Sequence, residues 1–593
     1  MRKHLLTFLQ LFTFLTILLI APRCHAQIGT WTALKNLEPN QGAGIMMLLT
    51  DGRVLCQSVK DSEAGWDILT PDSTGSYVNG TWTTAASMNQ WRLFFSSQVL
   101  PSGKVFVAGG EYGPGDTAGE IYDPVADTWT RTSPVTDTIN IYDGNSELLP
   151  NGQVLVGAQS GPNPSNDDLF YNPVNNQWAI APIAPLNHDE AQWLKLPDSS
   201  ILFIGINTLS SCRYRPQTNS WVMDSNVPDS IFDAYGGESG CALMLPNGKA
   251  IFFGAEIHNA IYTPSGDSNP GRWAVADSFP TIGTNPVGQT DAPGAMMVNG
   301  HILLSVAPVG NGPNNEFRNP AYFLEYNYLT DSFTQVTSII PGMGADSIAG
   351  NTCSNVTFLD LPDGNVLMVC SQNDTNSMQY YVYTPGSGPI PQGKPTIDHI
   401  IPQTYPYYKI TGKLFNGISE GAAFGDDLQM SSNYPLVRLK SSTGRVYYCK
   451  TTNWNRLGAV RTDSLEDTAT FEVPAGLPPG SYSLVVVANG FASNPTVYNT
   501  PAGIQTISNS AGIKIYPNPS NGVFTASIKN CGTEITNRIL VYNMLGQEVY
   551  SQSNIKNSTF KIDLSTQPSG LYLYRVSDEN GNILSQGKLE IQK

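Results

Sequence analysis

Short apolar segments alternate with polar turns along most of the chain, and one arrangement of them recurs seven times between residues 48 and 385. Each copy has an apolar strand, a tight turn and a second apolar strand. Asn-Gly and Asp-Gly between apolar runs favour a type I′ turn, which needs positive φ at both central residues. The pattern therefore predicts seven β-hairpins, with Ser199 near the turn position in the fourth copy and a glycine there in the others: Gly52, Gly103, Gly152, Gly248, Gly300 and Gly364.

A further pair of strands follows each hairpin, and the second of them carries an aromatic residue in six copies: Trp82, Trp129, Trp178, Trp221, Trp273 and Phe333. Four strands per copy and a period of about 50 residues are typical of kelch repeats, in which each copy is one blade of a β-propeller. We therefore predict an all-β protein with a seven-bladed kelch β-propeller over residues 27–390. The recurring aromatic residues are expected to pack between neighbouring blades.

The seventh copy ends at Gly388 without a closing tryptophan, whereas Trp31 lies near the start of the chain. We expect the strand around Trp31 to complete the last blade, because this joins the two ends of the ring and removes an exposed sheet edge.

Residues 1–26 have the pattern of a signal peptide. Arg2 and Lys3 precede an apolar run from Leu5 to Ala21, and cleavage is expected after Ala26. No later stretch approaches the roughly 18 apolar residues of a transmembrane helix, so no membrane span is expected. The protein is expected to leave the cytoplasm.

The chain has 48 acidic and 32 basic residues, a formal net charge of −16. This balance argues against nucleic acid and anionic membrane surfaces as partners, since both attract basic patches. The cysteines show no metal-binding spacing. Those within apolar strands (Cys56, Cys241 and Cys370) are expected to be buried thiols, and one disulfide remains an alternative, with no pair favoured.

Two further domains follow the propeller. A Pro- and Gly-rich linker, Pro389–Ile397, precedes new strand-like alternation, and PAGLPPGSYSLVVVANG resembles the final hairpin of an immunoglobulin-like β-sandwich. We predict this domain over residues 391–506, and a last domain over residues 507–593 after a linker of small residues.

The last domain carries specific motifs: IYPNPSNG (Ile515–Gly522), ILVYNMLGQEVY (Ile539–Tyr550) and FKIDLSTQPSGLYLYRV (Phe560–Val576). These resemble the C-terminal sorting domain of the type IX secretion system. The resemblance implies a small β-sandwich that meets the secretion machinery through residues 513–593. It also implies a protein that is secreted or held at the outer-membrane surface.

Residues 30–505 resemble the galactose oxidase and glyoxal oxidase family, through WRLFFSSQVLPSGKVFVAGGE and PGSYSLVVVANG. That family holds copper with two tyrosines, one of them cross-linked to a cysteine, and two histidines. This chain has Phe94 in place of the cross-linked tyrosine and Ser354-Asn355 in place of a Tyr-His pair. Lys450 lies near the place of the second histidine. The resemblance therefore implies the fold, while copper is not expected.

The segments just before each inner strand are expected to meet at one mouth of the propeller, where loops build sites on a rigid frame. They supply the candidate ligand-binding residues Arg92, Tyr142, Asp143, His188, Asp189, Glu190, Glu238 and Asp291. Carboxylates held close together need a compensating cation. The pattern therefore predicts either a salt-bridge network centred on Arg92 or a hard cation such as calcium at Asp189, Glu190, Glu238 and Asp291.

Structural roles remain an alternative for these side chains, since acids of inner strands often bond the backbone of a neighbouring blade. His188 beside Asp189 fits either a general base or a simple polar pair. Three functions stay open: a non-catalytic binding or adhesion protein for extracellular glycan or protein, a carbohydrate lyase or hydrolase, and a structural surface-layer protein. The missing copper ligands favour the first.

Overall fold

The computed structural model describes residues 28–40, 42, 44–58, 63–114, 118–135, 139–142, 144–158, 166–336, 351–370, 379–425, 428–457, 465–500, 513–528, 537–555, 559–577 and 583–593. The predicted signal peptide and Asp143 lie outside these residues. The described chain is all-β apart from two single-turn helices, η1 (Cys353–Asn355) and η2 (Pro391–Gly393). It divides into two compact units, Met1–Asn499 and Thr500–Lys593.

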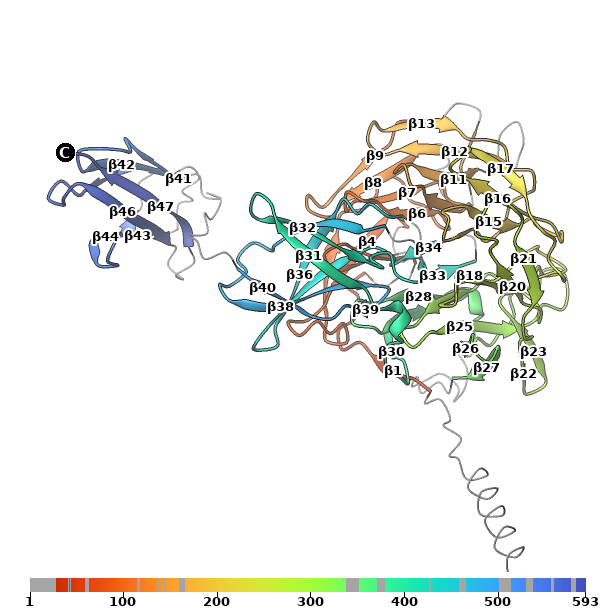
Figure 1. Cartoon of the computed structure of the whole chain (residues 1–593). Helices are drawn as coiled ribbons and strands as arrows, with labels where there is room; N and C mark the ends of the chain where they lie inside the picture. The colour runs from red at the N-terminus through yellow and green to blue at the C-terminus, as the bar shows by residue number, and fades with distance from the viewer. Residues whose placement is uncertain are drawn as a thin grey trace, which may run out of the picture. The chain divides into compact units, whose positions relative to one another are not determined.

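Four-stranded antiparallel units follow one another along the first compact unit (Figure 1). The first two are β2 (Met46–Leu48), β3 (Val54–Ser58), β4 (Gly65–Thr70), β5 (Thr81–Ala85) and β6 (Ser96–Val99), β7 (Val105–Ala108), β8 (Gly119–Asp123), β9 (Thr128–Arg131). The third and fourth are β10 (Ser146–Leu148), β11 (Val154–Ala158), β12 (Asp167–Asn172), β13 (Gln177–Ile180) and β14 (Leu194–Lys195), β15 (Ile201–Ile204), β16 (Ser211–Arg215), β17 (Ser220–Met223).

The fifth unit is β18 (Ala242–Met244), β19 (Ala250–Phe252), β20 (Ala260–Thr263) and β21 (Arg272–Val275). The sixth is β24 (Pro293–Met296), β25 (His301–Pro308), β26 (Tyr322–Asn327) and β27 (Ser332–Gln335), extended by β22 (Thr281–Ile282) and β23 (Asn285–Gly288). The seventh joins β28 (Val356–Asp360), β29 (Val366–Cys370) and β30 (Tyr381–Thr384) to β1 (Thr30–Ala33).

The turn between the first two strands of each unit differs from the predicted type I′ turn and needs fewer residues with positive φ. Gly52 has φ 79°, while Asp51 is not among the residues with positive φ. The Gly52 N–H donates to the Leu49 carbonyl at 3.0 Å, and the Leu49 N–H donates to the Arg53 carbonyl at 2.8 Å. This is a three-residue loop that needs only one left-handed residue. Ser199 takes that conformation in the fourth unit, with φ 67°.

The N-terminal strand closes the seventh unit as predicted. β1 pairs antiparallel with β30, so that Trp31 lies opposite Tyr383. The Trp31 ring packs 4.6 Å from the Tyr383 ring and 4.9 Å from Phe323 of the sixth unit, between ring centroids. Residues more than 300 positions apart are thereby tied together, and the outer edge of β30 is covered.

The recurring tryptophans pack between neighbouring units, which confirms that prediction. Trp129 lies 5.3 Å from Trp66 of the preceding unit, and its indole N–H donates to the Ala86 carbonyl at 2.9 Å. The other tryptophans form similar bonds. The indole of Trp82 donates to the Asn36 carbonyl and that of Trp178 to the Ser133 carbonyl. The indole of Trp221 donates to the Pro182 carbonyl and that of Trp273 to the Ser211 hydroxyl. Each indole therefore satisfies its donor while its ring fills the gap between sheets.

The rest of the first compact unit forms another sheet and one long hairpin. The sheet holds β31 (Thr396–Pro402), β32 (Tyr407–Lys413), β35 (Leu436–Ser441), β36 (Val446–Thr452), β37 (Asp467–Glu472), β38 (Ser481–Ala488), β39 (Phe491–Ala492) and β40 (Thr496–Asn499). The hairpin, β33 (Gly421–Phe424) and β34 (Leu428–Ser431), instead pairs with β24 of the sixth unit. The domain boundary near residue 390 stays a prediction, because both parts belong to one compact unit.

The second compact unit contains two sheets around one apolar core. The sheets are β41 (Ile513–Tyr516), β42 (Val523–Ile528), β45 (Thr559–Asp563) and β43 (Asn537–Asn543), β44 (Glu548–Ile555), β46 (Gly570–Ser577), β47 (Ile583–Ile591). Phe524, Val541, Ile562 and Val576 are fully buried between them.

Cysteines within the described residues are all buried free thiols: Cys56, Cys212, Cys241, Cys353, Cys370 and Cys449. The buried thiols predicted in the apolar strands are thus confirmed. None of the helices in the described part of the chain has the length and apolar character that a membrane crossing needs.

Replacing Trp31 with alanine is expected to lower the free energy of unfolding by about 2–4 kcal/mol, because a half-buried aromatic side chain is lost from the closing strand. Urea denaturation measures this change. Thr30→Ala, an exposed change in the same strand, should stay within about 0.5 kcal/mol. Equal effects of the two changes would show that closure does not depend on Trp31.

Candidate functional site

The strands of each unit run between two ends of the structure. The hairpin turns lie at one end, where the sheet of β31–β40 covers several of them. A Cβ at Gly52 would meet the Tyr448 ring and one at Gly103 would meet the Lys450 side chain. The segments that precede the first strands lie at the opposite end, which we call the mouth.

The β33–β34 hairpin connects these two ends through the middle of the units. It contacts β2, β6, β18, β24 and β28, the first strands of five units, and Figure 1 shows it among them. Its far end reaches the mouth, because a Cβ at Gly425 would collide with the carboxylate of Asp291. We call it the axial hairpin.

Gln429 on the axial hairpin joins the first strands of the second and third units. Its amide oxygen accepts from the Ser97 N–H and from the Ser146 hydroxyl, both at 3.0 Å, and its amide nitrogen donates to Asn145 Oδ1 at 3.1 Å. The Ser97 hydroxyl donates to the Gln429 carbonyl at 3.0 Å. A single side chain therefore satisfies polar groups that would otherwise be buried without partners.

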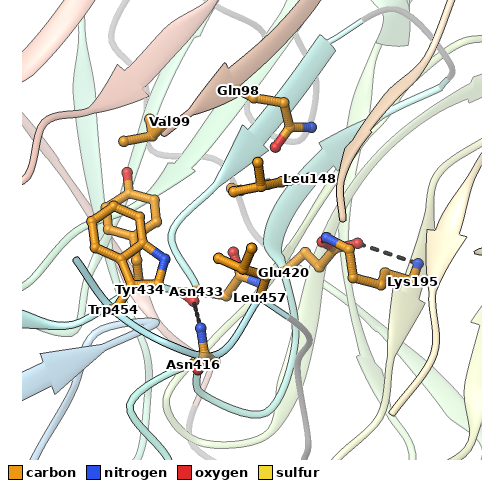
Figure 2. A pocket seen from close by; sticks show the side chains of 11 residues that line it. Gln98, Val99, Leu148, Lys195, Asn416, Glu420, Asn433, Tyr434, Trp454 and Leu457 are labelled. Atoms are coloured by element: carbon orange, nitrogen blue, oxygen red, sulfur yellow. Dashed lines mark hydrogen bonds and ion pairs between the residues drawn. The ribbon is translucent and has the colours of Figure 1, made fainter. Parts of the chain in front are cut away.

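A buried charged cluster fixes the base of the axial hairpin. Lys195 Nζ lies 2.6 Å from Glu147 Oε2 and 2.9 Å from Glu420 Oε1. Lys195 belongs to β14 and Glu147 to β10, whereas Glu420 directly precedes β33, so the cluster joins three parts of the chain. Figure 2 shows Lys195 and Glu420 meeting beside Leu148.

The cavity at this cluster is too small to be a substrate site. It has a volume of about 10 Å³ and is lined by residues such as Gln98, Tyr434 and Trp454. That space holds about one water molecule. The cluster is therefore a structural clamp.

Burial, reinforced by repulsion from Glu420, raises the pKa of Glu147 well above its usual value although Lys195 opposes the shift. The pKa of Lys195 is raised, because the attraction of the two carboxylates outweighs burial. The raised pKa of Glu147 favours its neutral form, which reduces the negative charge that has to be buried beside Lys195.

Arg92 pairs with a glutamate of its own unit. Its side chain is fully buried, and its guanidinium donates to the Gly109 carbonyl at 2.7 Å and pairs with Glu120 at 3.2 Å. Glu120 also accepts from the backbone N–H groups of Asn89 and Gln90. Glu120 of β8, a partner that the sequence did not suggest, thus holds Arg92 within the same unit, and a network of Arg92 with the mouth acids stays a prediction.

His188 is also a structural residue. Its Nε2 lies 3.1 Å from Asp168 Oδ1, and both side chains are buried. The other oxygen of Asp168 accepts from the Trp221 indole at 2.8 Å. Asp168 of β12, rather than the adjacent Asp189, is thus the partner of His188, and the pair links the third and fourth units away from solvent.

The remaining predicted acids lie near one another at the mouth. The Ser239 hydroxyl donates to the Glu190 carbonyl at 3.2 Å, and the Ser239 carbonyl accepts from the Asp291 N–H at 3.0 Å. The Glu238 N–H donates to buried Asp233, which also caps three neighbouring N–H groups. Asp189 is half-buried on the turn that contains Glu190.

These acids do not assemble into a metal site. Across the ranges that the structure describes, no three His, Cys, Asp or Glu side chains are grouped so as to hold a metal ion. The predicted calcium-type site at Asp189, Glu190, Glu238 and Asp291 is therefore not found, and Asp143 lies outside the described residues.

Lys450 was predicted to lie near the place of the second copper-binding histidine of the resembling family, and this placement is wrong. Lys450 lies on β36 at the turn end, beside Gly103. The part of this region that reaches the mouth is the axial hairpin near Gly425. Phe94, the residue in place of the cross-linked tyrosine, does lie at the mouth, with its ring centroid 6.1 Å from that of Tyr112.

Exposed aromatic side chains gather on one side of the mouth. Trp91 is 40% exposed, Tyr112 is 51% exposed and Tyr142 is 37% exposed. Their segments adjoin, since the Leu93 N–H donates to the Tyr112 carbonyl at 3.0 Å and the Gly110 N–H donates to the Tyr142 carbonyl at 2.7 Å. Of the predicted residues, Tyr142 alone belongs to this aromatic cluster.

Comparison with known proteins identifies the last domain. A family model described as a secretion system C-terminal sorting domain matches residues 514–590, which confirms the prediction from its motifs. The protein is therefore secreted or displayed at the outer-membrane surface, and it interacts with the secretion machinery. No curated protein matches the chain.

One solved structure similar to the chain is a fungal alcohol oxidase of the AA5 family in complex with copper. It shares 14% sequence identity, with a TM-score of 0.46 over 80% of this chain and 99% of that chain. This likeness is too slight to assign an activity.

Lys195→Met is expected to lower the free energy of unfolding by about 3–5 kcal/mol, because it leaves Glu147 and Glu420 without the cation that pairs with both of them. The matched control is Lys104→Met, which breaks the exposed 3.0 Å pair with Asp123 and should cost at most about 1 kcal/mol. Similar losses in urea denaturation would contradict the clamp.

Glu147→Gln is expected to become more stable relative to the parent as pH rises. The folded parent keeps a proton that the unfolded chain releases above the usual glutamate pKa, so the parent loses stability between that pKa and the raised one. Glutamine has no such proton. Denaturation curves at several pH values from 5 to 8 measure the difference, and a constant difference would contradict this charge state.

Proposed function

We propose that the protein is a secreted or cell-surface binding protein whose mouth holds an extracellular glycan on its exposed aromatic cluster. The observation that carries this proposal is the contrast between two sets of side chains at the mouth. Arg92 and His188 are committed to buried internal pairs, whereas Trp91, Tyr112 and Tyr142 offer aromatic surface to solvent. Binding thus has a surface, whereas Arg92 and His188 are held in buried pairs.

The fold assignment that accompanies this proposal is a seven-bladed kelch β-propeller over residues 27–390 and an immunoglobulin-like domain over residues 391–506. The repeated turns, the indole bonds between units and the closure by β1 support the propeller. Such a frame suits a binding role, since it holds surface loops rigidly at little entropic cost on binding.

A neutral glycan fits the chemistry of this surface better than a charged one. Aromatic rings present flat apolar faces with polar rims, and sugar rings have C–H faces that can stack on them. The net charge of −16 disfavours anionic polysaccharides. The predicted protein partner is the alternative that the same test addresses.

Alanine at Trp91, Tyr112 or Tyr142 is expected to weaken binding to a neutral polysaccharide by roughly tenfold each, as for central aromatic contacts in interfaces. Affinity electrophoresis of the purified full chain through gels containing mannan, xylan or galactan measures this. The control is Tyr407→Ala, an equally exposed tyrosine on β32, which should bind like the parent.

Binding that survives loss of all three aromatic side chains would overturn the proposed site. Absence of binding to any polysaccharide would favour a protein partner or a structural surface role. Release of sugar fragments from a bound polysaccharide would identify the protein as a carbohydrate-active enzyme instead.

A further inference from the structure

The sorting domain has a groove on the outer face of its four-stranded sheet. The groove has a volume of about 380 Å³ and is lined by Tyr542 of β43, Leu573 and Arg575 of β46, and Gln586 of β47. In the sheet register Tyr542 lies opposite Leu573, and Arg575 lies opposite Gln586. The lining residues thus occupy two adjacent rows across three strands.

This face carries several apolar side chains, where a two-layer sandwich normally turns polar residues to solvent. Val541 and Val576 fill the core. The alternate positions, Leu540, Tyr542 and Leu573, face outward and are half-buried. The strands therefore have apolar side chains on both faces, and packing in the core explains those of the inner face alone.

The turn between β43 and β44 forms a wall of the groove and presents more apolar surface. Met544 lines the groove and is 63% exposed, and Leu545 beside it is 85% exposed. Asn543 holds this turn, because its side-chain oxygen accepts from the N–H groups of Leu545 and Gln547, both at 3.0 Å. The two apolar side chains are thus held out in a fixed conformation, which lowers the entropy cost of binding a partner.

We propose that this groove and turn form the surface by which the secretion machinery recognises the domain. The domain is a sorting signal, so a protein of that machinery must bind it. Arg575 is the one charged side chain that lines the groove. The partner segment that fits is therefore a protein segment with an apolar side chain next to a carboxylate, which would pair with the Arg575 guanidinium.

The test follows export of the full chain in the bacterium that produces it, with variants at exposed positions. Leu545→Asp and Arg575→Glu are each expected to reduce the exported fraction by at least about tenfold, since each places a negative charge where the partner is apolar or acidic. Matched controls on the other sheet are Tyr516→Asp and Lys514→Glu, both exposed residues of β41, and these should be exported normally.

Thermal unfolding of each purified full-length variant checks that the fold is retained. Normal export of folded Leu545→Asp and Arg575→Glu would overturn the proposal, as would equal loss of export in the controls. Sedimentation of the parent tests whether a second copy of the chain occupies the surface instead. A dimer that Leu545→Asp dissociates would assign the surface to self-association and would also overturn the proposal.

Discussion

The axial hairpin is the constraint on which the rest of the first compact unit depends. Four-stranded units arranged in a ring leave polar backbone and side-chain groups facing the middle, and burial of these groups without partners costs free energy. The hairpin supplies the partners: β33 pairs with β24, Gln429 bonds Ser97, Asn145 and Ser146, and Glu420 completes the charged cluster at Lys195. Its backbone and side chains thus fix how neighbouring units meet.

Pairing of buried charged groups also accounts for two of the side chains predicted to bind a ligand at the mouth. The side chains that suggested acid–base chemistry belong to internal pairs, Arg92 with Glu120 and His188 with Asp168, and these pairs fix loops and link units. The side chains at the mouth include the aromatic rings on adjoining segments and the acids near Ser239. The sorting domain shows the same division, with a core that accounts for one sheet face and an outer face that remains for a partner.

Sequence patterns predicted the local structure well because they are local rules. Gly52 and its counterparts mark turns, and Trp129 and its counterparts mark a spacing that only packing between units explains. The sorting motifs were specific enough to identify the last domain. The partners of Arg92 and His188 could not be predicted, because Glu120 and Asp168 lie on outer strands whose facing direction depends on the assembled sheet. Glu147 and Lys195 did leave a signal, since each interrupts an apolar first strand. The aromatic cluster depended on which rings remain exposed after folding, and a linear pattern does not contain that information.

Hydrogen–deuterium exchange of the full chain, with and without a saturating neutral polysaccharide, shows whether the mouth is the binding surface. A glycan bound there is expected to slow exchange in residues 91–94, 109–114 and 139–142, which carry the aromatic cluster, and to leave exchange unchanged at the turn end around Gly52 and Gly103. Protection confined to the turn end or to the sheet of β31–β40 would contradict the claim that the mouth is the binding surface.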